Sequence, residues 1–139
     1  MSESETELEF TCVNELRSII DYNFLFLLTK SSLNKFKVKA ISDISVVDRT
    51  APAVTFIETL IKKDLIQSDE ISELSLKDLQ NETDIVLPEN FPNEFITVPL
   101  ISPTRGNIGY WVMVRSERAT NTEKELLLHI SETFSHALG

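Results

Sequence analysis

The spacing of apolar positions predicts that the chain begins with a helix. Over residues 8–21 the apolar side chains recur mainly at steps of three and four, which places them on one stripe of an amphipathic helix. This stripe consists of Leu8, Cys12, Leu16, Ile19 and Ile20. Residues 1–7 before it carry several glutamates and no apolar pattern. We therefore expect a disordered acidic tail followed by a single domain over residues 8–139.

Two strands are predicted next. Residues 24–28 form a short continuous apolar run, residues 35–40 alternate between basic and apolar, and the polar residues 31–34 supply the turn of a hairpin. A helix that continues through Leu33 is the alternative, which the aromatic content disfavours. The alternation predicts two faces for the second strand, with Phe36, Val38 and Ala40 on one and Lys35, Lys37 and Lys39 on the other.

A second helix is predicted from Pro52 to Lys63. Proline is tolerated in a first helical turn, and Lys62 and Lys63 complement the helix dipole in the last one. Between them lies an apolar stripe of Val54, Ile57, Leu60 and Ile61. The next segment, residues 65–94, is polar and irregular, and we expect little more than a helical turn within residues 74–79.

The pattern after residue 95 predicts a second hairpin. Residues 96–101 and 108–115 are rich in β-branched and aromatic side chains, and residues 102–107 between them include a proline and a glycine that favour a turn. Pro99 indicates an edge position or a bulge, because proline cannot donate a ladder hydrogen bond. Gly109 in the second strand indicates a bulge or a close backbone approach.

The chain closes with a third predicted helix. Thr122 and Glu125 have the spacing of a capping box at its start. The apolar residues that follow recur at helical intervals and are Leu126, Leu127, Ile130, Phe134, Ala137 and Leu138.

Length and composition narrow the class of protein. A chain of 139 residues with 42% hydrophobic residues fits one globular domain with its own core. Its single cysteine, Cys12, excludes an internal disulfide and zinc sites that need paired cysteines. A reducing compartment follows as the default, so we expect a cytoplasmic domain, which is compatible with a membrane-associated full-length protein.

The net charge of −9 argues against nucleic-acid binding, which needs clustered lysine and arginine. No window approaches the length of apolar sequence that crosses a membrane, so direct membrane insertion is not expected. The last helical pattern continues to Gly139 without a clear stop signal. We therefore expect the chain to be a fragment of a longer protein, with covalently linked domains.

The closing sequence resembles that of the GAF domain. The segments that carry the resemblance are "ITVPLIS", "NIGYWVMV" and "TNTEKELLLHISETFSHAL", which together cover the last third of the chain. The rest agrees with the family in the order of its elements. The resemblance implies an α+β fold, a central antiparallel sheet flanked by N- and C-terminal helices, with a ligand cavity on the other face. A PAS or profilin-like sheet is the alternative.

Alternation in the last strand separates its side chains into two sets. Tyr110, Val112 and Val114 share one face, and Trp111, Met113 and Arg115 share the other. In a GAF-like fold one set would contact the terminal helices and the other would line the cavity. The sequence leaves open which is which.

The ligands and reactions known for the GAF family find little support in the residues. Cys12, in an apolar stripe, is expected to be a buried hydrophobe and not a bilin attachment site. A single cysteine also excludes the thiol exchange of the family's free-methionine sulfoxide reductase. The pairs Asn34-Lys35 and Asp69-Glu70 occur in the chain, but the phenylalanine of the cyclic-nucleotide motif is missing before the second pair.

Catalysis and metal binding are not predicted either. His129, His136, Glu125 and Glu132 lie along the last helix, where a solvated polar face explains them better than convergent metal ligands do. No serine, cysteine or aspartate stands at triad spacing from either histidine. We therefore expect no enzyme activity, no metal and no cofactor.

The best candidates for ligand contact are Asp48, Arg49, Tyr110 and Trp111. Asp48 and Arg49 lie at a corner between a strand and a helix, where ligands are often bound, although a helix cap and a surface ion pair are the simpler interpretation. The alternating lysines 35–39 offer an anion-binding surface or, more simply, a solvent face that discourages edge pairing.

Two functions remain open. The first is a non-catalytic GAF-like sensory or regulatory module that binds a small molecule, forms a homodimer, or does both, and relays through its terminal helices to another domain. The second is a structural interaction or dimerisation domain, with a cavity filled by side chains, in a larger transport or secretion adaptor protein. The residues expected on the dimer helices are Leu8, Leu16, Ile130 and Phe134.

Overall fold

The computed structural model describes residues 16–18, 20–30, 35–43, 47–63, 65–66 and 69–138. Within the first predicted helix, residues 16–18 form a short 3₁₀ turn, η1 (Leu16–Ser18). The rest of that prediction up to residue 15, the acidic tail over residues 1–7, and the hairpin turn at residues 31–34 lie outside the described residues.

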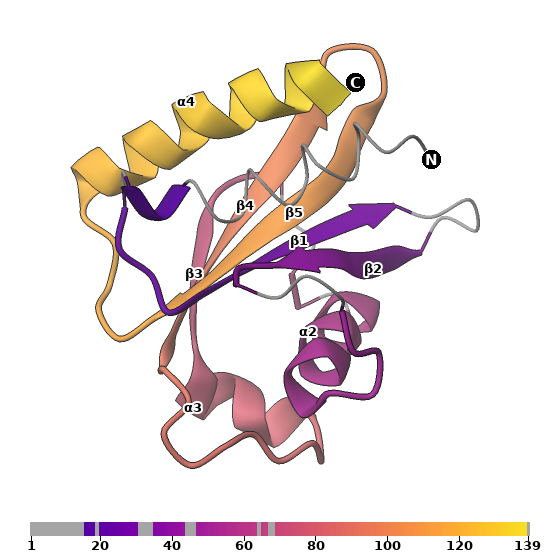
Figure 1. The fold of residues 1–139 in the computed structure, drawn as a ribbon, viewed down its shortest axis with the longest axis vertical. Helices are drawn as coiled ribbons and strands as arrows, with labels where there is room; N and C mark the ends of the chain where they lie inside the picture. Colours follow the sequence, from indigo (N-terminus) through magenta and orange to yellow (C-terminus); the bar gives the residue numbers. More distant parts are fainter. Residues whose placement is uncertain are drawn as a thin grey trace.

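A five-stranded antiparallel sheet forms the centre of the molecule, as the α+β prediction requires (Figure 1). Its spatial order is β2-β1-β5-β4-β3, so the first hairpin and the last hairpin lie side by side. The strands are β1 (Phe24–Lys30), β2 (Phe36–Ile41), β3 (Ser72–Ser75), β4 (Glu94–Ser102) and β5 (Gly106–Arg115).

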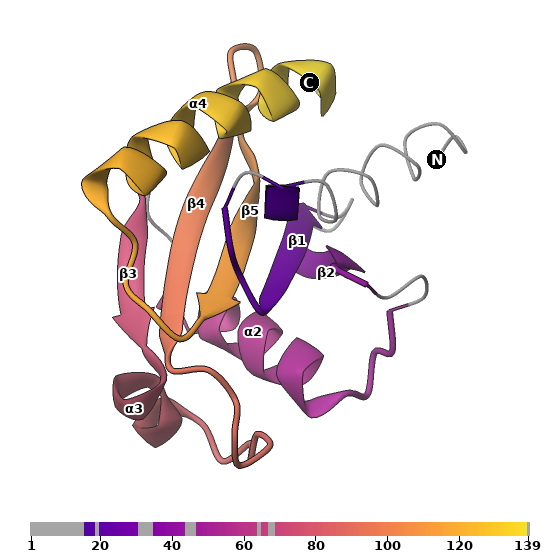
Figure 2. The same ribbon diagram turned by 60° about the vertical axis from the view of Figure 1, so that its left-hand side comes forward.

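The long helix α4 (Asn121–Leu138) and the turn η1 cover one face of the sheet, and shorter helices cover the other (Figure 2). Helix α4 packs over β4 and its neighbours. Helix α2 (Pro52–Lys62), the short helix α3 (Leu76–Leu79) and the 3₁₀ turn η2 (Gln80–Glu82) lie on the opposite side. The predicted second and last helices are thus confirmed, and the two cores lie above and below the sheet.

The predicted facing of the second strand is wrong at Ala40. Leu27 pairs with Ala40 and Leu28 with Val38, so Lys39 is an extra residue that forms a β-bulge. Because a bulge reverses the alternation, Phe36 and Val38 pack toward α2 whereas Ala40 packs in the core beneath α4.

Strand β3 was not predicted by the sequence pattern. Its four residues pair with β4 over Ser72 to Ser75 and are all half-buried, so they lack the apolar alternation of a strand that buries one face. Helix α3 follows without a break and confirms the helical turn expected within residues 74–79.

The β4–β5 hairpin confirms the expectations for Pro99 and Gly109. Strand β3 begins at Ser72, opposite Thr97, so the outer edge of β4 at Pro99 has no neighbouring strand among the described residues. At Gly109, a Cβ atom would overlap the backbone oxygen of Leu28 on β1, so this position accepts only glycine without backbone movement. A register shift between Leu100 and Ile101 adds a bulge next to both sites.

The capping box of α4 begins two residues earlier than predicted. The amide of Glu123 donates to the Thr120 hydroxyl at 3.1 Å, and the Thr120 amide donates to the Glu123 carboxylate at 2.9 Å. These reciprocal bonds satisfy two donors at the start of the helix. Thr122 and Glu125, which have the same spacing, are both exposed.

Candidate functional site

The structure assigns the two faces of β5 that the sequence left open. Trp111 and Met113 are fully buried beneath α4, and the ring of Trp111 packs against Phe134 at a centroid distance of 5.5 Å. Tyr110 and Val112 belong to the core on the α2 side. The two aromatic candidates for ligand contact therefore lie on opposite faces and do not share one site.

Tyr110 lies on β5, the central strand of the described sheet, on the face that α2 covers. Its ring meets Phe36 of β2 edge to face at 5.2 Å. Burial raises the pKa of the Tyr110 phenol; a hydrogen bond with Asn107 opposes this shift, and the negative charge of Asp69 adds to it. The phenol therefore stays protonated at neutral pH.

Asp48 organises the turn before α2 and does not cap the helix. Its carboxylate accepts hydrogen bonds from the Thr50 amide at 2.9 Å and the Thr50 hydroxyl at 2.7 Å. The hydroxyl bond and then the amide bond lower the pKa of Asp48 below its ordinary value. The N-cap residue of α2 is Ala51, whose side chain makes no capping hydrogen bond. The prediction that Asp48 caps this helix is therefore wrong.

Arg49 forms the ion pair that the sequence suggested, and its partner is Glu58 in α2. The guanidinium lies 3.0 Å from the Glu58 carboxylate, which also accepts a hydrogen bond from the Val38 amide at 2.8 Å. Lys37 lies 3.9 Å from the same carboxylate. Glu58 thus fastens α2 to the outer edge of β2, where a strand would otherwise leave its amide unpaired.

An apolar groove of about 330 Å³ opens at the first turn of α2. We use the term apolar groove for the space between that turn, the strands β1 and β2, and the loop before β4. Asn90 is the one polar side chain among the described residues that line it. The others include Phe24, Phe26, Ile41, Pro52, Val54 and Phe91.

Phenylalanine rings continue from this groove into the core. Phe24 stacks on Phe91 at 5.4 Å, Phe91 contacts Phe95 at 6.1 Å, and Phe95 meets Phe56 edge to face at 6.0 Å. These rings fill much of the space between the sheet and α2. The apolar groove is the part of that space that remains open.

A second groove, of about 540 Å³, runs along the other end of α2. We call it the lysine groove because four lysines line it, together with one glutamate, Glu58. The four lysines are Lys30 at the end of β1, Lys35 just before β2, Lys37 in β2 and Lys62 at the end of α2. Phe36, Thr55, Thr59 and Ile61 complete its lining.

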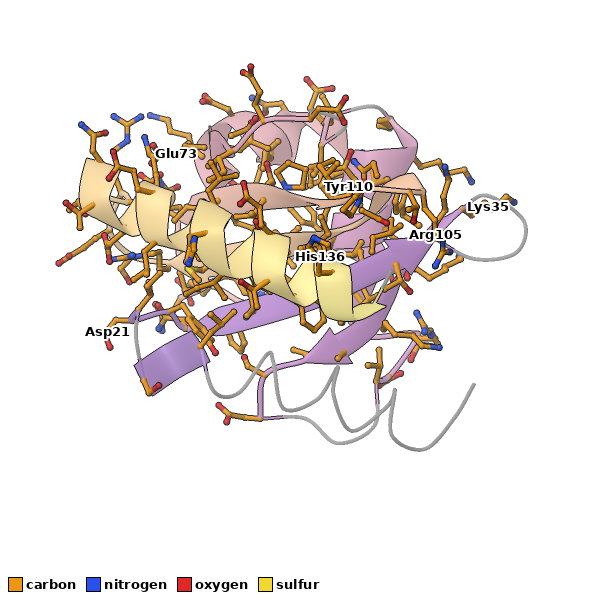
Figure 3. All side chains as sticks on the ribbon, turned by 90° about the horizontal axis from the view of Figure 1, so that it is seen from above. Asp21, Lys35, Glu73, Arg105, Tyr110 and His136 are labelled. Atoms are coloured by element: carbon orange, nitrogen blue, oxygen red, sulfur yellow. The ribbon has the colours of Figure 1, made fainter. Side chains whose placement is uncertain are left out.

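Ion pairs hold the first turns of α4 to the sheet. Arg115 of β5 is nearly buried and lies 2.9 Å from Glu123. Lys124 pairs with Glu73 of β3, and Arg118 lies 3.9 Å from the same carboxylate. Figure 3 shows Glu73 beside the first turns of the helix, at the end of the molecule opposite Lys35.

The carboxylates in these pairs have shifted pKa values. The pKa of Glu73 is lowered mainly by its hydrogen bond with Lys124. The pKa of Glu123 is lowered mainly by the hydrogen bond from the Thr120 amide, and Arg115 lowers it further. In both, partial burial opposes the shift. Both groups are therefore charged at neutral pH.

The residues considered for metal binding do not converge. Glu125, His129, Glu132 and His136 are all exposed along α4. No group of three or more histidine, cysteine, aspartate or glutamate residues able to hold a metal ion occurs in the part of the chain that the structure describes. Cys12 lies outside that part.

Sequence reasoning missed most of both grooves because their residues come from distant segments. Lys30 and Lys62 are 32 positions apart and meet only because α2 crosses the edge of the first hairpin. The alternating lysines were the one visible signal. Nothing in the irregular segment 65–94 indicated that Pro88, Asn90 and Phe91 would close the apolar groove.

Comparisons by sequence return nothing, since no protein-family model and no curated protein matches the chain. Comparisons by structure return GAF folds. A domain assigned to a two-component sensor histidine kinase of Sinorhizobium meliloti 1021 superposes with a TM-score of 0.66 at 14% identity, covering 99% of this chain and 92% of that one. The GAF domain region of a protein assigned to the membrane in Geobacter sulfurreducens PCA gives 0.64 at 8% identity, with 97% and 93% covered.

An enzyme has the same fold. The type II free methionine-R-sulfoxide reductase of Thermoplasma acidophilum gives a TM-score of 0.61 at 13% identity, covering 96% of this chain and 91% of that one. The predicted GAF-like fold is thus confirmed, in preference to the PAS or profilin-like sheet. Within the described residues, no helix is long and apolar enough to cross a membrane.

Proposed function

We propose that the chain is a non-catalytic regulatory module that binds a small apolar molecule in the apolar groove. The observation that carries this proposal is the lining of that groove, in which Asn90 alone among the described residues supplies a polar side chain. Ligand sites of proteins are mostly apolar clefts with few polar groups that fix orientation. A flat or aromatic ligand suits a groove lined by the half-buried rings of Phe24 and Phe91.

The regulatory part of the proposal rests on fold likeness and on a path from the groove to α4. One neighbour in structure is a domain of a sensor histidine kinase. Phe24 lines the groove and pairs with Val114 on β5, the residue before Arg115. Since Arg115 holds Glu123 at the start of α4, a ligand that shifts β1 would change the docking of α4 and hence of a following domain.

A neutral fluorescent probe tests this binding site. N-phenyl-1-naphthylamine is apolar and uncharged, so we expect it to bind the wild-type protein with increased fluorescence and to raise the unfolding temperature. Ala53→Leu adds apolar atoms to the groove and should abolish binding, while Ala53→Ser leaves the groove open and should retain it. Probe binding that is equal in both variants would exclude this groove as the site.

Native mass spectrometry of the freshly purified protein extends the test to natural ligands. A stoichiometric adduct that disappears in Ala53→Leu and persists in Ala53→Ser would identify the ligand class. The same spectra report the number of subunits. We expect a cytoplasmic homodimer, with covalently linked domains in a longer protein.

A second function, a scaffold or dimerisation domain in a transport or secretion adaptor, is favoured by the filled core. Six of the eight phenylalanines belong to the core on the α2 side, which leaves less room for a ligand. Leu16 and Phe134, expected on a dimer face, are instead buried within their own chain. A dimer contact through α4 would therefore use its outer face, where Leu128 is 46% exposed. The scaffold function predicts association without any ligand-dependent stabilisation.

A further inference from the structure

We propose that the lysine groove is a second binding site, which takes the phosphate group of a phosphorylated small molecule. This site is separate from the apolar groove, since the two lie along different parts of α2 and share no lining residue. The lysine groove suits an anionic ligand, whereas the apolar groove suits an uncharged one. The proposal stands whether or not an apolar ligand binds.

Charge distribution is the first observation that supports the site. The chain as a whole has a net charge of −9, with 22 acidic residues against 13 lysines and arginines. Against that background, the described residues that line one groove include four lysines and one glutamate. A groove lined mainly by charges of one sign raises the local concentration of counter-ions, which favours an anionic ligand there.

The glutamate of the groove is held mainly by groups other than these lysines. The Glu58 carboxylate receives the Val38 amide at 2.8 Å and the Arg49 guanidinium at 3.0 Å. Lys37 is at the outer limit of an ion pair with it, at 3.9 Å. Glu58 therefore positions the wall of the groove, and Arg49 balances its charge from outside the lining.

The groove also has a place for the uncharged part of a ligand. Phe36 lines it and is half-buried, and the ammonium of Lys30 lies 5.7 Å from the centre of its ring. A cation over a ring face is an attractive arrangement, which orients the exposed Lys30 side chain toward Phe36. The volume of about 540 Å³ is that of a site for a small molecule.

Phosphate matches this set of groups better than a carboxylate does. A phosphate carries more charge and more acceptor oxygens than a carboxylate does, and lysine, a compact charge with three donors, commonly binds it. The lysines belong to β1, to β2 and the residue before it, and to α2, so more than one element offers donors to the several oxygens of a phosphate. The phosphate could belong to a soluble phosphorylated molecule or to a lipid headgroup, and the experiment separates these sources.

Inorganic pyrophosphate is the probe for the soluble source. Isothermal titration calorimetry at about 20 mM salt should show binding that weakens at about 200 mM, because screening lengths fall below the size of the groove. The double variant K30Q/K62Q should bind at least about tenfold more weakly. Its control, K63Q/K77Q, changes the net charge equally at lysines that do not line the groove and should bind as the wild type does.

Flotation with vesicles of phosphatidylcholine and phosphatidic acid tests the lipid source. Binding of these vesicles that K30Q/K62Q loses and K63Q/K77Q keeps, without pyrophosphate binding, would assign the site to a headgroup. Pyrophosphate binding with the same pattern assigns it to a soluble ligand. If neither probe binds at low salt, or if both double variants weaken binding equally, the proposal is overturned. Circular dichroism of each variant verifies that it is folded.

Discussion

The two faces of the sheet are covered in different ways. On one face α4 packs along β4 and shares a core with the N-terminal residues Leu16, Ile20 and Tyr22. The helix is fixed at its start by Glu123 and Lys124, and Trp111 is completely buried beneath it. On the opposite face α2, α3 and a long loop share the task. Both grooves described above lie on that second face, one at each end of α2.

This difference indicates which face serves binding and which serves structure. A long helix can pack against a strand along its whole length, whereas several short elements leave gaps where they meet. Clefts between elements are where proteins bind small molecules. We therefore expect changes beneath α4 to affect stability first, and changes around α2 to affect binding first.

The largest expected effect comes from removing a ring beneath α4. Phe134 is 6% exposed and packs on Trp111, so Phe134→Ala should lower the free energy of unfolding by about 3–5 kcal/mol. Phe91→Ala, at the half-buried rim of the apolar groove, should cost about 1–2 kcal/mol because less surface is buried there. Urea unfolding measures both, and equal losses would contradict the contrast between the faces.

A substitution at Gly109, where the backbones of β5 and β1 approach each other, should disturb the packing on both faces of the sheet. At Gly109 an added Cβ would overlap the backbone of Leu28, so Gly109→Ala should destabilise the protein by about 2–3 kcal/mol. Gly106→Ala is the control, because Gly106 has open space around it and only its φ of 74° is unfavourable, at about 1 kcal/mol. A smaller loss at Gly109 than at Gly106 would show that β1 and β5 can separate easily.

The ion pairs of α4 predict a dependence of stability on pH. Glu73 and Glu123 have pKa values below their ordinary 4.5 when folded, so their contribution is complete above about pH 4.5 and is lost as the pH falls through the lowered values. In E73Q/E123Q this acid-sensitive part should be reduced, with a loss of about 1 kcal/mol at pH 7. Glutamine preserves the capping box, which isolates the charge.

Urea midpoints between pH 3 and pH 7 make the measurement for the wild type and the variant. A matched variant, E89Q/E117Q, changes two exposed glutamates for which no ion pair is described, and should keep the wild-type profile. If E73Q/E123Q also keeps the wild-type pH dependence, the loss of stability in acid does not come from the ion pairs that hold α4.

The same contrast explains how much could be predicted from the sequence. Around α4 the predicted β4–β5 hairpin and last helix were confirmed, because each carries a long periodic pattern. The structural effects of Pro99 and Gly109 could also be predicted, because they depend on the residue type alone. The capping box was misplaced because two Thr–Glu pairs with the same spacing overlap there. Sequence offered two candidates, and only the fold shows that Thr120 and Glu123 form the bonds.

Around α2 the sequence was less informative, for a physical reason. Strand β3 is too short for a pattern, and Lys39 reverses the facing of β2 through a bulge that no residue type announces. Tyr110 and Trp111 could be placed on opposite faces but not assigned to either. The grooves combine residues from separate segments, and such combinations depend on tertiary contacts.

The smallest expected effect is on the outer face of α4, which neither core uses. Leu128→Ser should change the unfolding free energy by less than about 0.5 kcal/mol, because the side chain is 46% exposed and contacts little of its own chain. If the chain dimerises through this face, the same variant should reduce the fraction of dimer in sedimentation velocity. His129→Ser, at the neighbouring exposed position, is the control. A dimer that both variants leave unchanged would place the contact elsewhere and leave α4 free to move when the opposite face binds a ligand.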